Sequence, residues 1–204
     1  MGKLNTTTNL DPSNVGLRGS YLVIDGDITG NFNLTKVGQD VIKLAGVNSF
    51  LNLNIDGGII QVGSPDAVSP TSIVSTRGEG SSGIFDLNGY NLTIGGLSGP
   101  SGAVNNSAFD DYTLYVSTAA DYVYGGSIGG SVTLRKQGPA KQTLTGVNEY
   151  NGGTILEEGV LSVAADARLG RVHLTTRVDS LRLIGGTLET TADMTIVPTR
   201  GLTL

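Results

Sequence analysis

The sequence predicts an all-β solenoid in which short strands stack coil upon coil into one elongated rod. Strand-like segments of about four residues follow one another along the chain, and no window shows the i, i+3, i+4, i+7 spacing of an amphipathic helix. One 25-residue segment also recurs 100 positions later. A β-sandwich folds back through Greek-key connections and need not repeat along its sequence, whereas a solenoid does. The repeat therefore favours the solenoid.

The repeated segment spans residues 26–50 and 126–150, and ten of its 25 positions are identical. The shared residues are glycines, aliphatic residues, one asparagine and one lysine: Gly26, Ile28, Gly30, Leu34, Lys36, Gly38, Leu44, Gly46, Val47 and Asn48, which recur as Gly126, Ile128, Gly130, Leu134, Lys136, Gly138, Leu144, Gly146, Val147 and Asn148. Phe50 corresponds to Tyr150. No carboxylate, histidine or serine is shared, so the repeat indicates backbone shape and packing rather than catalysis. We expect Asn48 and Asn148 either in left-handed corners or in stacked amide ladders.

Taken in chain order, the expected strands are short apolar or alternating runs bounded by Gly, Asn, Asp or Pro. In the first part of the chain they are Tyr21–Ile24, Phe32–Thr35, Val41–Leu44, Leu51–Ile55, Ile59–Val62, Ile84–Leu87 and Asn91–Ile94. In the second part they are Tyr112–Val116, Val132–Leu134, Gln142–Thr145, Thr154–Leu156, Val160–Val163, Val172–Leu174, Ser180–Ile184 and Met194–Val197. Only Ala164–Leu169 has the composition of a single helical turn.

The spacing of these strands defines the predicted coils. At ~20–25 residues per coil, the 100-residue unit holds about four coils and the chain about eight or nine. We expect one elongated domain over residues 1–204, a fragment of a longer chain, with repeat units at about 21–120 and 121–204 and the second cut short. Alternation along the strands predicts two sets of side chains: Leu34, Leu44, Leu53 and Ile60 inside, and Thr35, Lys43, Asn52 and Gln61 toward solvent.

Composition excludes several classes of function. The net charge of −5 is not the basic footprint of a nucleic-acid-binding protein. Cysteine is absent, which removes disulfides, thiolate catalysis and thiolate metal sites. No apolar run approaches the ~18 residues of a membrane-spanning helix. Glycine supplies 31 of 204 residues, about twice the usual share of ~7%, as expected for a chain with many corners.

Three runs of the second copy resemble the autotransporter-associated β-strand repeat, also called the passenger-associated transport repeat. They are Leu134-x-Lys136-x-Gly138, Leu144-x-Gly146-x-Asn148-x-Tyr150-x-Gly152-x-Thr154 and Gly159-x-Leu161-x-Val163. The stretches Tyr124–Gly130 and Asn88–Gly99 are similar to other recurring passenger segments, so the resemblance covers most of the chain from about Gly26 onward. The first copy has Leu51–Asn54 where the second has Asn151–Thr154, so we expect a different turn after Phe50.

The resemblance implies a right-handed parallel β-helix that is exported across the bacterial outer membrane and displayed on the cell surface or outside the cell. In such proteins the repeat serves as scaffold, which implies a segment that is not an enzyme and needs no cofactor. The partners that it implies are the neighbouring coils of the parent chain, with no membrane insertion by this segment.

Two short motifs match catalytic or cofactor patterns by letter only. Gly78–Gly83 matches G-x-G-x-x-G, but a strand follows it where dinucleotide binding needs a helix. Gly125–Gly129 matches G-x-S-x-G, which requires a strand-to-helix turn and a histidine partner. The single histidine, His173, is expected on the solvent face of a strand, and without a second His or Cys it is not a metal site.

Acidic pairs are the remaining candidates for catalysis, because glycosidic cleavage uses two carboxylates ~5–9.5 Å apart. The pairs are Asp25 with Asp27, Asp110 with Asp111, and Glu157 with Glu158. All lie in or beside expected turns, where solvation explains them. A polysaccharide-cleaving β-helix fragment is therefore the weakest of the functions considered.

The most informative feature outside the repeat is aromatic. Five of the eleven aromatic residues fall within 16 positions: Phe109, Tyr112, Tyr115, Tyr122 and Tyr124. Tyrosines are rigid and amphipathic, so this cluster either packs where coils change size or binds a partner. The sequence therefore leaves two main hypotheses: a structural scaffold with no activity of its own, or an adhesin module that binds itself, a host protein or a glycan.

Overall fold

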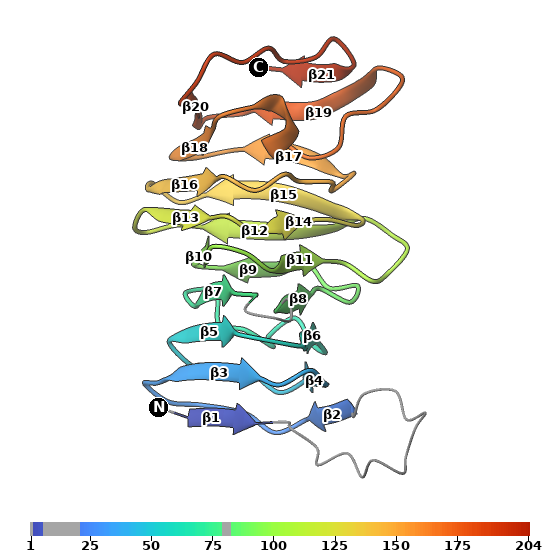
Figure 1. The fold of residues 1–204 in the computed structure, drawn as a ribbon. Helices are drawn as coiled ribbons and strands as arrows, with labels where there is room; N and C mark the ends of the chain where they lie inside the picture. The colour runs from blue at the N-terminus through green and yellow to red at the C-terminus, as the bar shows by residue number, and fades with distance from the viewer. Residues whose placement is uncertain (1, 6–20, 79–82) are drawn as a thin grey trace.

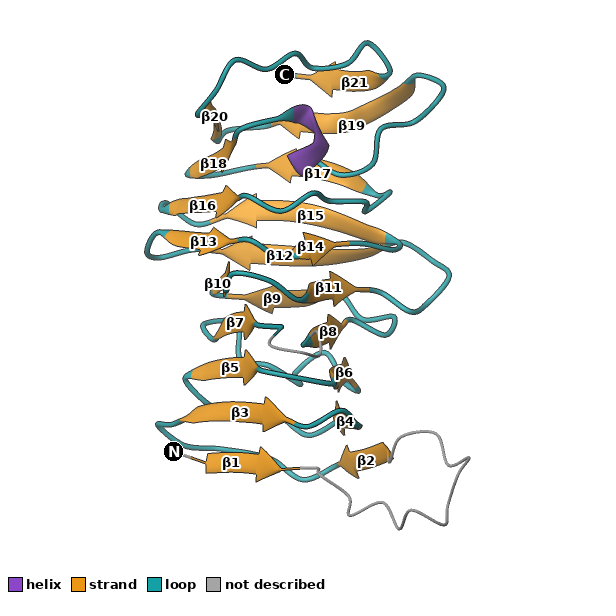
Figure 2. Cartoon of the chain, in the orientation of Figure 1, coloured by secondary structure: helices purple, strands orange, loops and turns teal. Residues whose placement is uncertain are grey.

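The computed structural model describes residues 2–5, 21–78 and 83–204, and here the chain coils into a parallel β-helix of about nine turns (Figure 1). All strand pairings among the described residues are parallel, and β1 (Gly2–Asn5) and β21 (Arg200–Thr203) lie at opposite ends of the rod. The fold class and the number of coils expected from the sequence are confirmed. Figure 2 shows strands and loops throughout, with one 3-10 helix, η1 (Asp166–Arg168), inside the segment expected to form a helical turn.

Four parallel sheets run along the axis of the rod. Sheet I has the order β1, β3 (Asn33–Val37), β5 (Asn52–Ile55), β7 (Ile73–Thr76), β10 (Gly96–Ser98). Sheet II has the order β2 (Tyr21–Ile24), β4 (Val41–Leu44), β6 (Ile59–Val62), β8 (Ile84–Asp86), β11 (Ala103–Asn105), β14 (Ser127–Ile128). Sheet III has the order β9 (Leu92–Ile94), β12 (Tyr112–Ser117), β15 (Val132–Gln137), β17 (Gly153–Leu156), β19 (Arg177–Leu183), β21. Sheet IV has the order β13 (Tyr122–Tyr124), β16 (Lys141–Leu144), β18 (Val160–Val163), β20 (Thr187–Thr190).

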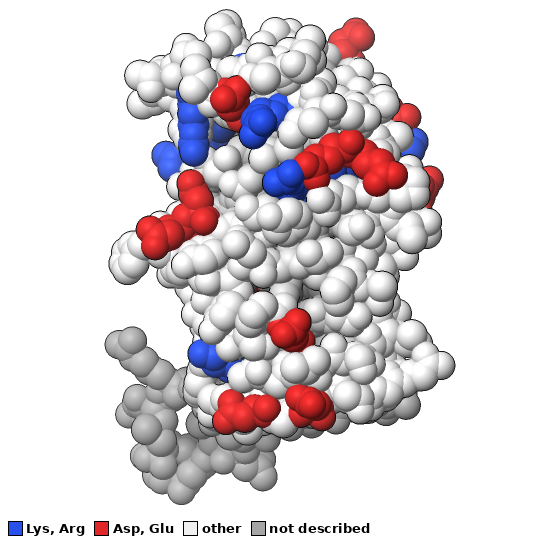
Figure 3. Space-filling view, turned by 180° about the vertical axis from the view of Figure 1, so that it is seen from behind, with Lys and Arg blue, Asp and Glu red and all other residues white. Residues whose placement is uncertain are grey.

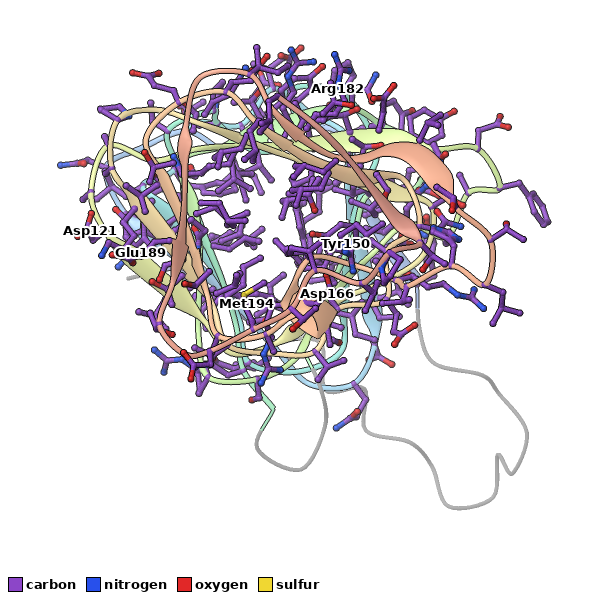
Figure 4. The ribbon with its side chains drawn as sticks, turned by 90° about the horizontal axis from the view of Figure 1, so that it is seen from above. Asp121, Tyr150, Asp166, Arg182, Glu189 and Met194 are labelled. Atoms are coloured by element: carbon purple, nitrogen blue, oxygen red, sulfur yellow. The ribbon has the colours of Figure 1, made fainter. Side chains whose placement is uncertain are left out.

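Stacked aliphatic rows fill the interior, as the view along the axis shows (Figure 4). In sheet III, Leu114 pairs in register with Leu92 below and Leu134 above, and all three side chains are buried. Each such Leu or Ile contributes about 1.5–3 kcal/mol by leaving water. Because every coil adds members to the same rows, the rod needs no globular centre.

The inside-outside assignment from the sequence is confirmed for the aliphatic set and wrong at one polar position. Thr35 is 3% exposed rather than solvent-facing. It lies on β3 beneath the side chain of Asn54, whose amide donates to the Thr35 hydroxyl at 3.3 Å. A polar side chain on a stacked sheet is thus covered by the coil above it even when it points outward.

Two expected strands are wrong. Val172–Leu174 and Met194–Val197 have irregular backbone, although each reads as a short apolar run. Both lie toward the end of the chain, where Leu174 is fully exposed and Met194 is only partly buried against the core. Apolar alternation alone therefore does not make a strand.

The two copies of the repeat lie on different faces of the rod, which corrects the expectation of a four-coil period. Leu34 lies on β3 in sheet I, whereas Leu134 lies on β15 in sheet III. The strands stacked above β3, one per coil, are β5, β7, β10 and then β13. A bridge between Gly99 and Tyr124 joins β13 to the end of β10. The chain then crosses β14 before it reaches β15. The 100-residue spacing is therefore four coils plus two further sides.

A side chain reinforces the join between sheets I and IV. Gln142, on β16, is 1% exposed and reaches past β13 to β10. Its amide donates to the Leu97 carbonyl at 2.9 Å, and its oxygen accepts from the Leu97 N–H at 3.1 Å. These two bonds satisfy backbone groups that a regular strand pairing would have satisfied.

Candidate functional site

The repeated lysines lie inside the rod at the corners between consecutive strands. Lys136 is 1% exposed, and its ammonium donates to the carbonyls of Gln137 (2.5 Å), Gly138 (2.7 Å) and Glu158 (3.2 Å). Gly138 has φ +73°, which turns its carbonyl inward, and a non-glycine residue rarely adopts that conformation. The ammonium thereby joins the corner of one coil to the corner of the next.

Lys36 repeats this arrangement in the first copy. Its ammonium donates to the carbonyls of Val37, Gly38 and Gly57 at 2.9, 2.7 and 3.1 Å. The residue above the Lys36 ammonium, in the next coil, is Gly58. A Cβ there would lie 2.7 Å from the ammonium, so a larger residue would displace the lysine side chain. All three donors of each lysine are satisfied within the fold, so neither lysine is available for catalysis or ligand binding.

The lysine corners predict a stability that rises with pH in a defined range. Burial lowers the pKa of Lys136 to about 8, against the opposing charge of Glu158, and burial lowers the pKa of Lys36 as well. An unfolded lysine has a pKa of ~10.4. Between these values the unfolded chain binds more protons than the folded chain, so the free energy of unfolding increases from about pH 8 upward. Burial also raises the pKa of Tyr124 to about 12, which reverses the trend only above roughly pH 10.

Urea denaturation at about pH 7.5, 8.5 and 9.5 measures this effect. The double variant Lys36→Met/Lys136→Met is less stable throughout, and its profile across this range is expected to be flatter than that of the natural chain. A natural chain that loses stability between about pH 8 and 9.5 contradicts the assignment.

The repeated asparagines join three successive coils. The Asn148 side-chain oxygen accepts from the Ile128 N–H at 2.8 Å, and its amide donates to the Arg168 carbonyl at 2.7 Å. Asn48 makes equivalent bonds to Ile28 (2.7 Å) and Ala67 (2.9 Å). Neither asparagine has a positive φ or stacks on another amide, so both conformations expected from the sequence are wrong. Each side chain replaces ladder hydrogen bonds on the irregular side of its coil.

Replacing Asn148 by alanine is expected to lower the free energy of unfolding by about 2–3 kcal/mol, because it leaves the buried Ile128 N–H without an acceptor. Asn91→Ala is the matched control. Asn91 accepts from the Thr113 N–H at 2.7 Å across one coil, but it is exposed, so water replaces the lost bond. Urea denaturation of the two variants compares them, and equal losses would argue against the bridging role.

The five aromatic residues do not form one surface. Tyr124 is fully buried, and its hydroxyl lies 3.2 Å from both the Thr76 hydroxyl and the Ser127 carbonyl. Phe109 is fully exposed in the loop before β12. The remaining three are half-buried on different strands: Tyr112 and Tyr115 on β12 and Tyr122 on β13.

Tyr115 lies on the outer face of sheet III, where the Arg135 guanidinium is 5.5 Å from the centre of its ring. Arg135 also pairs with Glu157, and that guanidinium lowers the pKa of the Glu157 carboxyl. Tyr122 lies on a different face and contacts none of these residues by a hydrogen bond. Partner binding through the exposed members of the cluster therefore stays a prediction, and Tyr124 serves packing.

The letter matches to catalytic motifs lack their structural context. Ser127 lies within strand β14 and not at a strand-to-helix turn. Residues 79–82, which hold the centre of the G-x-G-x-x-G match, lie outside the described residues. His173 is in irregular backbone rather than on a strand, and burial and the neighbouring arginines, Arg177 first among them, lower its pKa.

One carboxylate of each acidic pair has a structural partner: Asp27, Asp111, and Glu157, which pairs with Arg135. An Asp27 carboxylate oxygen accepts from the Val47 N–H at 2.8 Å, which ties one coil to the next. Arg177 approaches Asp111 at 3.8 Å. The described residues contain no group of three or more His, Cys, Asp or Glu side chains placed to hold a metal ion. No helix in the described part of the chain is long and apolar enough to cross a membrane.

Most of the face in Figure 3 is uncharged, and its acidic and basic side chains form small separate groups. In the view along the axis, Asp121, Glu189 and Arg182 point outward, while Tyr150 points into the interior (Figure 4). Tyr150 is 1% exposed, and its hydroxyl lies 2.7 Å from the Thr154 hydroxyl.

Comparisons with known proteins agree with this architecture. The family model of the passenger-associated transport repeat matches residues 134–163, the segment that holds the Lys136 corner and the Asn148 bridge. The adhesin BmaC autotransporter of Brucella suis biovar 1 is 32% identical to the chain over 178 residues, which is 83% of this chain and 5% of that relative. The chain thus spans a small part of the length of this relative, and no solved structure gives a significant match. The chain belongs to the autotransporter passenger domains and carries the passenger-associated transport repeat.

Proposed function

We propose that this segment is a rigid spacer in a passenger that is exported through the outer membrane and displayed on the bacterial cell surface, and that it has no enzymatic activity of its own. The observation that carries the proposal is where the repeat uses its polar groups. Lys36, Lys136, Asn48 and Asn148 are buried and bond to backbone atoms of their own or adjacent coils. Nine coils at ~4.8 Å each give a rod of about 40 Å.

The test of the spacer role is made in the full-length parent protein. Lys136→Met and Asn148→Ala are expected to reduce the amount of protease-resistant passenger at the cell surface. Adhesion or any other activity per displayed molecule is expected to stay unchanged, since neither residue reaches solvent. A loss of activity per molecule at full display would contradict the spacer role.

Adhesion is the second candidate, and the name of the relative favours it. The half-buried tyrosines Tyr112, Tyr115 and Tyr122 would make the contacts, each from its own face, with a second copy, a host protein or a glycan. Substitution of Tyr112, Tyr115 and Tyr122 by serine, followed by cell-aggregation and glycan-array assays, tests this role. No change in either assay counts against adhesion through this segment.

A further inference from the structure

The step between sheets I and IV leaves a groove on the outside of the rod. A cavity of about 310 Å³ lies on the outer face of sheet I beneath β13. A second cavity of about 330 Å³ lies around the adjacent corner toward sheet III. The two share Ile73 and Tyr122, so they flank one aromatic ring; the first is otherwise lined by Asn52, Asn54, Ser75, Arg77 and Ser98. Volumes near 300 Å³ are at the lower end for ligand sites.

The Tyr122 ring packs over a glycine in the strand below it. Gly96, the first residue of β10, is buried, and a Cβ built there would lie 2.5 Å from Cδ2 of the Tyr122 ring. Any other residue at this position would displace the ring. The hydroxyl of Tyr122 has no hydrogen-bond partner among the described residues, unlike that of the buried Tyr124.

Polar groups without partners converge on the same groove. Ser75 is 6% exposed and lines the first cavity, yet its hydroxyl has no hydrogen bond among the described residues. Asn54 uses its amide nitrogen on Thr35, which leaves its oxygen free to accept. Arg77 is exposed at the rim, and among the described residues it is the only charged one that lines either cavity.

We propose that this groove binds a pyranose unit of an acidic glycan. The C–H groups on one face of a pyranose form an apolar surface that stacks on a tyrosine ring, here Tyr122. Its hydroxyls take amide and hydroxyl partners such as Asn54 and Ser75. A uronic acid carboxylate pairs with the guanidinium of Arg77, which forks to match it. The site goes beyond the spacer role, and neither requires the other.

The experiment is isothermal titration calorimetry of the 204-residue chain with a galacturonic acid hexasaccharide and a neutral galactose hexasaccharide. The acidic sugar is expected to bind more tightly. Tyr122→Ala is expected to weaken that binding at least tenfold, and Arg77→Gln to weaken the acidic sugar about fivefold without changing the neutral one. Tyr21→Ala is the matched control, because Tyr21 is an exposed tyrosine on β2 in sheet II and lines neither cavity. It is expected to leave both affinities within about twofold.

Three results would overturn the proposal: no binding of either sugar to the natural chain, an unchanged affinity in Tyr122→Ala, or an equal loss in Tyr21→Ala. Circular dichroism and thermal melting first establish that each variant is folded. If Tyr122→Ala does not fold, Arg77→Gln and Asn54→Ala replace it as the test, since both residues lie on the outer surface. The site is rejected if both variants bind the acidic sugar as tightly as the natural chain does. The spacer proposal survives any of these outcomes, because its readout is surface display.

Discussion

Replacing Gly146 with alanine is expected to lower the free energy of unfolding by about 3–5 kcal/mol, among the largest effects for a single methyl group. A Cβ at this position would lie 1.9 Å from the Gly126 carbonyl oxygen and 2.7 Å from its carbon. Both atoms belong to the backbone of the coil below, so no side-chain rotation relieves the overlap. The two coils would have to separate, and the adjacent Asn148 bridge would break with them.

The matched control is Gly26→Ala, at another glycine of the same repeat. A Cβ at Gly26 meets no atom within 4 Å, and its φ does not lie in the left-handed region. This substitution is expected to change stability by no more than about 0.5 kcal/mol. Urea denaturation followed by circular dichroism compares the variants. Similar losses at both positions would contradict contact between coils as the cause, because alanine at an open position with ordinary φ lowers the entropy of the unfolded chain and so does not destabilise the fold.

This pair of glycines shows what the sequence reveals and what it leaves out. The repeat predicts that Gly26 and Gly146 are structural, and it correctly places the aliphatic residues inside. The repeat does not distinguish the two glycines, because a residue that is identical in both copies indicates only that the local backbone conformation is the same. Only the contact with the coil below separates them, and that contact involves residues about one coil away in the sequence.

The phase of the repeat was unpredictable for a similar reason. The motif encodes one strand, one corner, a second strand and an asparagine loop, all of which are local. It carries no information about which face of the rod it occupies. The stretch between the copies contains β9, β10 and β11, which put a strand on each of three sides. In the coils before β9, the side without a strand is the one that sheet III later occupies. In the coils after β14, it is the side that sheet II occupied earlier.

The candidate groove depends on residues that no sequence pattern groups together. The aromatic cluster in the sequence identified Tyr122 as a candidate binding residue. It identified Tyr124 equally, although Tyr124, two positions later on the same strand, is buried. Asn54 and Ser75 come from strands β5 and β7, and sequence reasoning missed both as site residues. Parallel stacking brings them onto one face, so the register of the coils had to be known first.

The interior at the C-terminal end of the rod depends on one ion pair, so Arg200→Met is expected to destabilise the chain by about 3–5 kcal/mol. The Arg200 side chain is 2% exposed and that of Asp166 10%. Two guanidinium nitrogens lie 2.7 and 3.1 Å from the two Asp166 carboxylate oxygens, and the group also donates to the Leu169 and Gly170 carbonyls. Removing the guanidinium leaves a buried carboxylate and these carbonyls without partners.

The exposed pair of Lys141 and Glu189 is the control, since its side chains are 35% and 38% exposed at a separation of 2.9 Å. Lys141→Met is expected to cost less than about 1 kcal/mol. A double variant, Arg200→Met with Asp166→Leu, is expected to regain about 1–2 kcal/mol over Arg200→Met alone, because it removes the stranded charge. Thermal melting and urea denaturation measure all three. If Arg200→Met is as mild as Lys141→Met, the end of the rod is held by its aliphatic rows alone, and the pair contributes nothing that water would not replace.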